Sequence, residues 1–262
     1  MTSHPAPPGL RAALSNRKIQ MLLGFLTAAA VASTTAAVAV GASSGAQAVD
    51  PAERARIEQI VHDYILAHPE ILPEAMERLK DKRMAEAVNT HRKELETPYA
   101  GAWEGAKDGD VTVVEFFDYN CSYCRASLAD ITKLVASDSR VKIVYRELPI
   151  LSEESTLAAR VSLLAAEQGK YAAFHKALFA GGRASKDSIL AAATKAGIDR
   201  KAAETAIISN RYDPEIEANL KLAQELGASG TPTFVVGGKV LGGAVGYEAL
   251  KEAVAAARSK EK

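Results

Sequence analysis

Residues 111–124 read VTVVEFFDYNCSYC, and this stretch decides the fold. Its first seven residues form an apolar run typical of a buried strand, and the only two cysteines of the chain follow as Cys121-Ser122-Tyr123-Cys124. A cysteine pair this close could be a structural disulfide, half of a metal site or a redox centre. A strand followed by CxxC and then by a helix favours the redox centre.

The two other interpretations fit the sequence less well. A disulfide stabilises mainly by closing a long loop in the unfolded chain, and a gap of two residues closes almost none. A zinc site needs about four ligands, yet there is no third cysteine and the histidines show no paired metal spacing. They are His4, His62, His68, His91 and His175. We therefore expect no metal and no cofactor other than a redox-active Cys121–Cys124 disulfide.

The composition is that of an ordinary globular protein. The chain has 262 residues, of which 48% are hydrophobic, with 32 basic and 32 acidic side chains. This length suffices for one sizeable domain plus an appendage. The zero net charge offers no electrostatic attraction to nucleic acid, and neither a phosphate-binding glycine loop nor a serine hydrolase motif is present. We expect no nucleic-acid partner.

Residues 1–48 have the pattern of a secretory signal peptide. Three basic residues precede an apolar run that extends from Ile19 to Val40, and small residues then end in an Ala-x-Ala at Ala48. We predict cleavage after Ala48; the alternative is an uncleaved membrane anchor formed by the apolar run. Either way the rest of the chain is expected in a bacterial-type periplasm, where a CxxC can donate or shuffle disulfides.

Residues 49–100 are expected to form an N-terminal helical segment. One helix should begin at Pro51, a residue favoured at the first helical position, and end at His68-Pro69, after which a second helix follows. Each helix carries one apolar stripe, which a short helix cannot bury by itself. The two helices therefore pack either on the main domain or on copies of themselves.

Residues 101–262 are expected to form the main domain. The predicted elements are strands at 111–117 and 141–146 on either side of a helix, further helices across about 152–228, strands at 233–236 and 239–241 around Gly237-Gly238, and a closing helix at 247–262. Strand, helix and strand in succession predict a parallel pair. The sequence thus predicts an α/β protein in which a helical insertion interrupts a small mixed sheet.

Three motifs in this order resemble the thioredoxin superfamily and, within it, the DsbA-like branch. Residues 115–124 resemble the strand that leads into the family's active site, residues 152–228 its helical insertion, and residues 229–234 its cis-proline loop. The resemblance covers about residues 108–258. It implies a thioredoxin fold (βαβ…ββα) with an inserted helical domain and the activity of a protein thiol–disulfide oxidoreductase.

Residues 65–72, ILAHPEIL, resemble the N-terminal extension of ScsC-like proteins (suppressor of copper sensitivity). Some of these proteins oligomerise through that extension and behave as disulfide isomerases. The resemblance implies that this chain could form a homo-oligomer through residues 50–97.

The four residues of the CxxC motif have separate expected roles. Cys121 should be an exposed nucleophile at a helix N-terminus, where the dipole and free N–H groups favour the thiolate. Cys124, one turn deeper, should resolve the mixed disulfide. Ser122 and Tyr123 should contact substrate and tune the redox potential, although Tyr123 could equally be a plain surface aromatic. Many relatives carry proline or histidine here, so we expect this chain to be less oxidising.

The resemblance adds three residues to the predicted site. Pro232 should be cis and lie opposite the CxxC, Thr231 should offer backbone hydrogen bonds to substrate, and Glu115 should handle the proton of Cys124. A charge inside an apolar strand is costly, so the pKa of Glu115 should rise. The alternative is that Glu115 faces a polar edge of the sheet.

Three other polar residues near these motifs are assigned ordinary roles. Asp118 and Asn120 are expected to be turn residues, and His175 a helix-surface or core histidine.

The favoured function is an exported enzyme that isomerises or reduces disulfides in protein substrates and depends on a membrane redox partner. One alternative is a DsbA-like oxidase that keeps Cys121 and Cys124 joined. A second is a Cu(I)-binding, copper-tolerance protein, since two soft thiolates suit Cu(I). A third is a structural adaptor that works through residues 50–97. The direction of electron flow, the client proteins and the oligomeric state stay open.

Overall fold

The computed structural model describes residues 50–260, so the expected signal peptide at residues 1–48 lies outside the described residues. The chain divides into two units between Ala55 and Arg56, and the first is described only at the start of its helix. The second unit contains the sheet and the helices that surround it. In the described part of the chain, no helix is long and apolar enough to cross a membrane.

Within residues 50–260, three helices precede the sheet. They are α1 (Pro51–Ala67), α2 (Ile71–Thr90) and α3 (Arg92–Glu96). The predicted break at His68-Pro69 is confirmed, because α1 ends just before it and α2 begins just after it. The short helix α3 was not expected from the sequence.

A mixed sheet of five strands in the order β1-β3-β2-β4-β5 forms the centre. The strands are β1 (Trp103–Gly105), β2 (Val111–Phe117), β3 (Val141–Glu147), β4 (Thr233–Val236) and β5 (Lys239–Gly242). The predicted parallel pair is confirmed for β2 and β3, and the other three pairings are antiparallel. Strand β1, at the edge, was not predicted.

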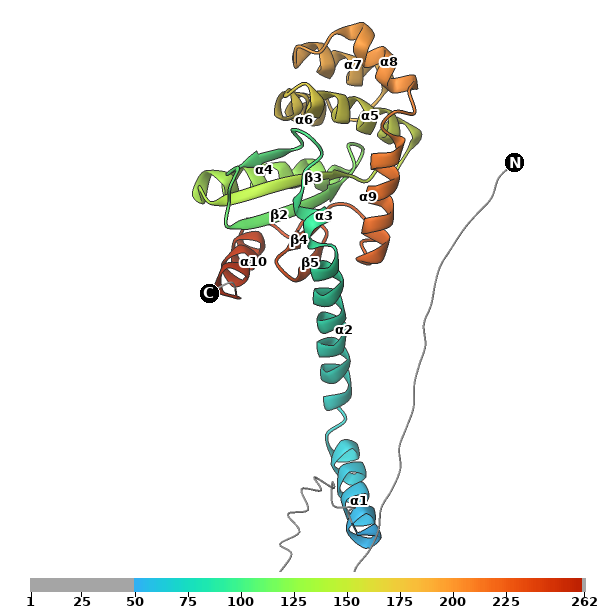
Figure 1. The fold of residues 1–262 in the computed structure, drawn as a ribbon, viewed down its shortest axis with the longest axis vertical. Coiled ribbons are helices and arrows are strands. Elements are labelled where there is room, and N and C mark those ends of the chain that lie inside the picture. Colours follow the sequence, from blue (N-terminus) through green and yellow to red (C-terminus); the bar gives the residue numbers. More distant parts are fainter. Residues whose placement is uncertain (1–49, 261–262) are drawn as a thin grey trace, which may run out of the picture. The chain divides into compact units, whose positions relative to one another are not determined.

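The helices connect and cover this sheet in the predicted order. They are α4 (Ser122–Ser137), α5 (Glu153–Glu167), α6 (Tyr171–Ala180), α7 (Lys186–Lys195), α8 (Arg200–Ile208), α9 (Asp213–Glu225) and α10 (Tyr247–Lys260). Helices α5 to α9 fill the predicted insertion, and α7 and α8 lie beyond α5 and α6 as seen from the sheet (Figure 1). The order βαβ, helices, ββα is that of a thioredoxin fold with a helical insertion.

Strand β2 separates two hydrophobic cores. Side chains alternate across a strand, so Glu115 and Phe117 share the face that α4, α10 and the helices of the insertion cover. Val114 and Phe116 point to the opposite face, which α2, α3 and α9 cover. The CxxC motif and its supporting residues belong to the first face.

Arg146, on β3, links the second face to the end of α3. Its Nη1 donates to Glu215 Oε1 at 3.1 Å and to Asn219 Oδ1 at 3.2 Å, both on α9. Its Nη2 donates to the carbonyl oxygens of Glu94 and Thr97, the latter at 2.7 Å. The last carbonyls of a helix lack partners within it, so Arg146 satisfies groups at the end of α3 and holds that helix against the sheet.

The β4–β5 hairpin, predicted from Gly237-Gly238, is confirmed and lies between two helices. Gly237 has a φ of +59°, and a Cβ placed there would be 2.9 Å from Ala257 Cβ on α10. A Cβ at Gly238 would be 3.3 Å from Ala85 Cβ on α2. The two glycines therefore allow both helices to approach the hairpin closely.

The first half of the helical segment leaves its apolar side chains uncovered. No residue of α1 is buried. The large apolar side chains exposed on α1 and the start of α2 are Ile57, Ile60, Val61, Tyr64, Leu66, Leu72, Met76 and Leu79. Further along α2, Val88 is buried in the core of the main domain. Packing on the main domain is thus confirmed for the end of α2 and does not extend to α1.

Candidate active site

Cys121 lies at the N-terminus of α4, directly after β2. It is the N-cap residue, and its Sγ accepts a hydrogen bond from the backbone N–H of Cys124 at 3.3 Å. The same sulfur donates to the carbonyl oxygen of Thr231 at 3.1 Å. Both cysteines are free thiols. A helix N-terminus and a donated N–H favour negative charge on a sulfur in this position.

The expected exposure of Cys121 is wrong. Only 5% of the residue is accessible, because the loop that carries Thr231 and Pro232 covers the sulfur. The Thr231–Pro232 peptide bond is cis, as predicted. Tyr123, by contrast, is 66% exposed, so the CxxC presents its middle residues to solvent more than its sulfurs.

Glu115 is buried in the middle of the sheet, with β3 on one side of its strand and β4 on the other. The alternative of a polar sheet edge is therefore wrong. Burial raises the pKa of Glu115 well above its usual range, and the charges of Glu104 and Cys121 raise it further. Burial, followed by the charge of Glu115, likewise raises the pKa of the Cys124 thiol. Glu115 thus lies close enough to Cys124 to influence the ionisation of that thiol.

A second buried carboxyl, Glu147, lies on the same face of the sheet. It pairs with Phe117 in the β2–β3 register, two residues beyond the Glu115–Tyr145 pair. Burial raises the pKa of Glu147, and its Oε1 has no hydrogen-bond partner within the described residues. The sequence reasoning missed Glu147. Its alternation with Ile143 and Tyr145, which puts it on the same face of β3, was the available signal.

His175 is a core histidine, and the surface alternative is wrong. Its Nδ1 lies 3.0 Å from the hydroxyl of Tyr119, which is hydrogen-bonded to Ser162 Oγ at 2.8 Å. The ring of Phe117 meets the imidazole edge-on and that of Tyr171 stacks on it. Burial lowers the pKa of His175 to about 3, so the imidazole is neutral at neutral pH. It therefore serves as packing behind the CxxC loop.

Asp118 and Asn120 do more than form a turn. Asp118 Oδ2 accepts hydrogen bonds from the backbone N–H groups of Ile150 and Leu151, both at 2.9 Å. Asn120 Nδ2 donates to Ser152 Oγ at 2.7 Å. These bonds attach the CxxC loop to the start of the helical insertion, a role that local sequence does not reveal because the partners are about 30 residues away.

Metal-ligating side chains are sparse around this site. Across residues 50–260, no three or more His, Cys, Asp and Glu side chains come together in a group that could hold a metal ion. The two thiols thus form a pair of soft donors without a third such ligand beside them in that part of the chain.

A family model described as DSBA-like thioredoxin domain matches residues 112–255. The chain belongs to this family. A second model, described as Copper resistance protein ScsC N-terminal domain, matches residues 53–86, which span most of α1 and α2. The DsbA-like thiol–disulfide oxidoreductase fold supports thiol–disulfide exchange.

Several solved structures resemble this DsbA-like chain. A thioredoxin-like oxidoreductase from Silicibacter pomeroyi DSS-3 is 43% identical with a TM-score of 0.60, and the match covers 63% of this chain and 95% of that one. A linker-deletion mutant of Proteus mirabilis ScsC is 28% identical with a TM-score of 0.63, covering 81% and 98%. A periplasmic thioredoxin-like protein from Salmonella enterica serovar Typhimurium is 30% identical with a TM-score of 0.59, covering 65% and 97%.

Among curated proteins, the DsbA-like chain matches part of a much longer sequence. It is 30% identical over 156 residues to Na(+)/H(+) antiporter NhaA 3 from Salinispora tropica, and the match covers 58% of this chain and 24% of the antiporter. The chain therefore spans about a quarter of the length of the curated relatives it matches.

Proposed function

We propose that this protein is an exported thiol–disulfide oxidoreductase that isomerises or reduces disulfides in protein substrates. The carrying observation is the position of Cys121 Sγ, which lies at a helix N-terminus between the N–H of Cys124 and the carbonyl of Thr231. The signal pattern in residues 1–48 and the likeness to a periplasmic Salmonella protein support export to the periplasm.

Exchange begins at Cys121. Its thiolate attacks one sulfur of a substrate disulfide; a bond forms between Cys121 and that sulfur while the substrate S–S bond breaks, and the second substrate sulfur leaves as a thiolate. In isomerisation, a substrate thiolate then attacks the mixed disulfide and restores Cys121, with no net transfer of electrons. In reduction, Cys124 attacks instead, the substrate keeps two electrons as a dithiol, and a membrane reductant must reduce the Cys121–Cys124 disulfide.

Glu115 supplies the base for this second step. Cys124 is a thiol at neutral pH because its pKa is raised, and it must lose a proton before it can attack. Glu115 is near enough for its charge to raise the pKa of that thiol, and its own pKa is raised, so its carboxylate is a stronger base than an ordinary one. It takes the proton of Cys124 as the sulfur attacks the mixed disulfide.

Isomerisation is favoured over net oxidation by two features of the loop sequences. Ser122 and Tyr123 replace the proline or histidine that many relatives carry, and Thr231 precedes the cis-proline as in isomerase-like relatives. In the DsbA-like oxidase alternative, the substrate thiolate attacks a standing Cys121–Cys124 disulfide, and a partner oxidant removes two electrons afterwards.

The test compares shuffling with oxidation. We expect the reduced protein to reactivate scrambled ribonuclease, Cys124→Ser to retain part of that activity, and Cys121→Ser to lose it at least a hundredfold. The redox potential against glutathione should lie towards the reducing end. A protein that oxidises reduced ribonuclease but cannot reactivate the scrambled form would overturn the isomerase assignment and support the oxidase.

The exposed apolar stripe of α1 supports a homo-oligomer formed through residues 50–97. Ile57, Ile60, Val61 and Tyr64 recur at helical spacing and are all about half exposed. The ScsC N-terminal domain model matches the same helix. An oligomer would bury this stripe and hold several CxxC sites together, which suits the shuffling of one substrate.

Mass measurement tests the oligomer. Deletion of all of residues 50–97 would also remove Val88 and the α3 carbonyls that Arg146 binds, so a point variant is cleaner. The double variant Ile60→Glu/Tyr64→Glu should have the mass of a monomer. Gln59→Ala, which changes a polar residue of the same helix outside the apolar stripe, should keep the mass of the wild type. A wild-type protein with the monomer mass would overturn the proposal.

A Cu(I)-binding role is the second candidate. It is favoured by the match to a copper-resistance domain model and by the two soft thiols. Titration of the reduced protein with Cu(I) should then show one equivalent bound tightly and lost in Cys121→Ser. Equal binding by that variant would exclude the site.

A further inference from the structure

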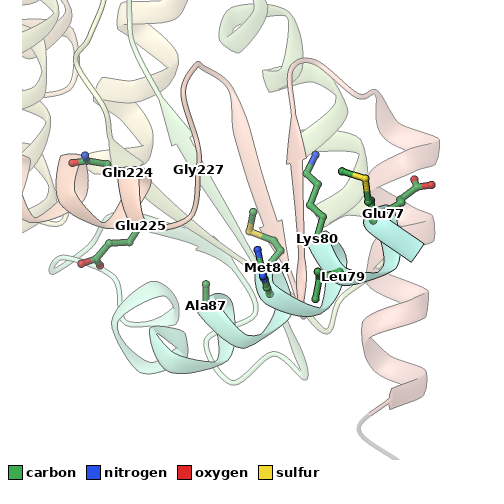
Figure 2. Close-up of a pocket in the computed structure, with 10 residues that line it drawn as sticks. Glu77, Leu79, Lys80, Met84, Ala87, Gln224, Glu225 and Gly227 are labelled. Atoms are coloured by element: carbon green, nitrogen blue, oxygen red, sulfur yellow. The ribbon is translucent and has the colours of Figure 1, made fainter. Parts of the chain in front are cut away.

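A groove leads from the cis-proline loop to α2. A hollow of 430 Å³ is lined by residues 226–233, among them Thr231 and Pro232, together with Lys80 and Met84 of α2. Lys80 and Met84 also line a second hollow of 810 Å³ between α2 and the end of α9, shown in Figure 2. A third hollow, of 300 Å³, shares Gly227 with both. The three adjoin one another at Gly227, and the first is lined by Thr231, whose carbonyl binds Cys121 Sγ.

The walls of this groove are largely apolar and adaptable. Met76, Leu79, Met84 and Ala87 line the second hollow from α2. Leu148, Ile150 and Leu220 line the third. Methionine side chains fit partners of varied shape because they are flexible and polarisable. Such walls suit the varied apolar side chains of a polypeptide.

The charge of the groove is positive where it nears the site. Lys80 lines both larger hollows and Arg83 lines the second, and within the described residues neither makes an ion pair. Of the acidic residues that line the second hollow, Glu225 is engaged by His91 at 3.2 Å, and Glu77 lies one turn before Lys80 on α2 (Figure 2). Among residues 50–260, the first hollow has Lys80 and no acidic residue in its lining, so an acidic group beside Thr231 would meet Lys80 without opposing charge.

We propose that α2 forms the far wall of the substrate site: the groove binds the extended polypeptide next to the substrate cysteine and prefers an acidic side chain beside Lys80 and Arg83. This inference rests on the proposed exchange function. An extended chain spans about 3.3 Å per residue, so a short segment that starts at Thr231 passes through adjoining hollows. Because α2 belongs to the N-terminal segment, that segment selects substrates as well as offering an oligomer surface.

The test uses two disulfide-linked peptide pairs that differ only in three positions next to the reactive cysteine, acidic in one and lysine in the other. Initial rates with glutathione as reductant would be measured for the wild type, for Lys80→Glu with Arg83→Glu, and for Arg78→Glu with Lys82→Glu. The last variant makes the same charge change on α2 at positions that do not line the groove. Thermal unfolding checks that each variant folds.

The wild type and the control variant should favour the acidic peptide about tenfold in kcat/KM, mostly through KM. The Lys80/Arg83 variant should favour the lysine peptide, and the control variant should reduce glutathione disulfide at the wild-type rate. An unchanged peptide preference in the Lys80/Arg83 variant overturns the proposal that this groove binds the substrate. A changed mass of the Lys80/Arg83 variant in solution, or an equal loss of kcat/KM for both peptides, would indicate that a second copy or residues 1–49 occupy the groove. Either result also overturns the proposal. If no peptide is reduced faster than by Cys121→Ser, the exchange function itself has failed.

Discussion

Two buried ionisable side chains, Arg146 and Glu115, lie near each other on opposite faces of the sheet, and only Arg146 has partners among the described residues that compensate its charge. Arg146 binds Glu215, Asn219 and backbone carbonyls at the end of α3, so its charge is compensated. Glu115 lies one register position away on the other face. There burial, followed by the charges of Glu104 and Cys121, opposes its ionisation and raises its pKa.

This difference in compensation indicates that Arg146 serves the stability of the fold and Glu115 the chemistry of the site. A compensated buried charge fixes how elements pack, and its removal leaves partners without hydrogen bonds. An uncompensated carboxyl costs stability and is retained where a shifted pKa serves a reaction. Polar atoms without partners in the described residues follow the same trend. On the site face they are Glu147 Oε1, Tyr171 Oη and Thr231 Oγ1, whereas the other face has only Arg146 Nε.

Arg146→Met should give the largest loss of stability. It leaves Glu215 without its partner and the carbonyls at the end of α3 unsatisfied, so we expect the free energy of unfolding to fall by about 3–5 kcal/mol. Denaturant unfolding measures this. Arg140→Met, which removes an exposed pair with Asp110, is the control and should change stability little. A small effect of Arg146→Met, with α3 still in place, would show that the compensation is not structural.

Glu115→Gln should have the opposite effect on stability to Arg146→Met. It should stabilise the fold but slow the attack of Cys124 on the mixed disulfide. Loss of the base should slow resolution of a mixed disulfide by Cys124 about a hundredfold. Because the folded pKa of Glu115 is raised, its contribution to stability is full below pH 4.5 and declines as pH rises towards the folded value. Glutamine does not titrate, so the variant should match wild type at pH 4 and be more stable at pH 7. Denaturant unfolding at the two pH values measures the difference.

Glu147→Gln is the matched control for Glu115. Glu147 is equally buried on the same face and also has a raised pKa, yet it is not among the groups that shift the pKa of Cys124. It should gain stability at pH 7 with little change in the resolution rate. Equal slowing in both variants would mean that buried negative charge in general, rather than Glu115, assists Cys124.

His175→Phe should alter the acid dependence of stability. The folded pKa of His175 is about 3 against an ordinary value of 6.5, so its contribution is full above pH 6.5 and is lost as pH falls towards 3. That loss is up to about 1.4 kcal/mol per pH unit. Melting temperatures between pH 7 and 4 should therefore fall less in the variant. Parallel curves for both proteins would show that the folded chain binds this proton as readily as the unfolded chain, so that burial does not lower the pKa of the ring.

Ser152→Ala should have the smallest effect. Ser152 caps α5 by accepting from the N–H of Ser155, and it also accepts from Asn120 in the CxxC loop. We expect a loss of about 1 kcal/mol and faster alkylation of Cys121. Asp199 caps α8 and has no hydrogen bond to that loop within the described part of the chain, so Asp199→Ala should lose similar stability without changing alkylation. Equal alkylation rates would show that the Asn120 bond does not hold the loop.

Local patterns predicted what depends on neighbouring residues. The apolar run 111–117, the Gly237-Gly238 turn and the break at His68-Pro69 each act within a few residues, and all are confirmed. The order of CxxC, helices and Thr231-Pro232 predicted the fold through its resemblance to a family.

Long-range partners could not be predicted in this way. Strand β1 has only three residues and exists because β3 offers it an edge. The role of Arg146 depends on carbonyls about 50 residues earlier and on α9 about 70 residues later. The cover over Cys121 comes from a loop 110 residues away, which is why the sequence predicted an exposed sulfur. In each case the deciding contact joins segments whose distance in space no local pattern encodes.

The glycine pair of the β4–β5 hairpin offers a way to sort relatives by architecture. Gly237 contacts α10, the closing helix of the ββα half, whereas Gly238 faces Ala85 on α2. A relative without a docked N-terminal helix has no reason to keep position 238 small. A bulky residue at position 238, which can be identified from sequence alone, would therefore indicate a chain whose N-terminal helical segment is missing or does not pack on the hairpin.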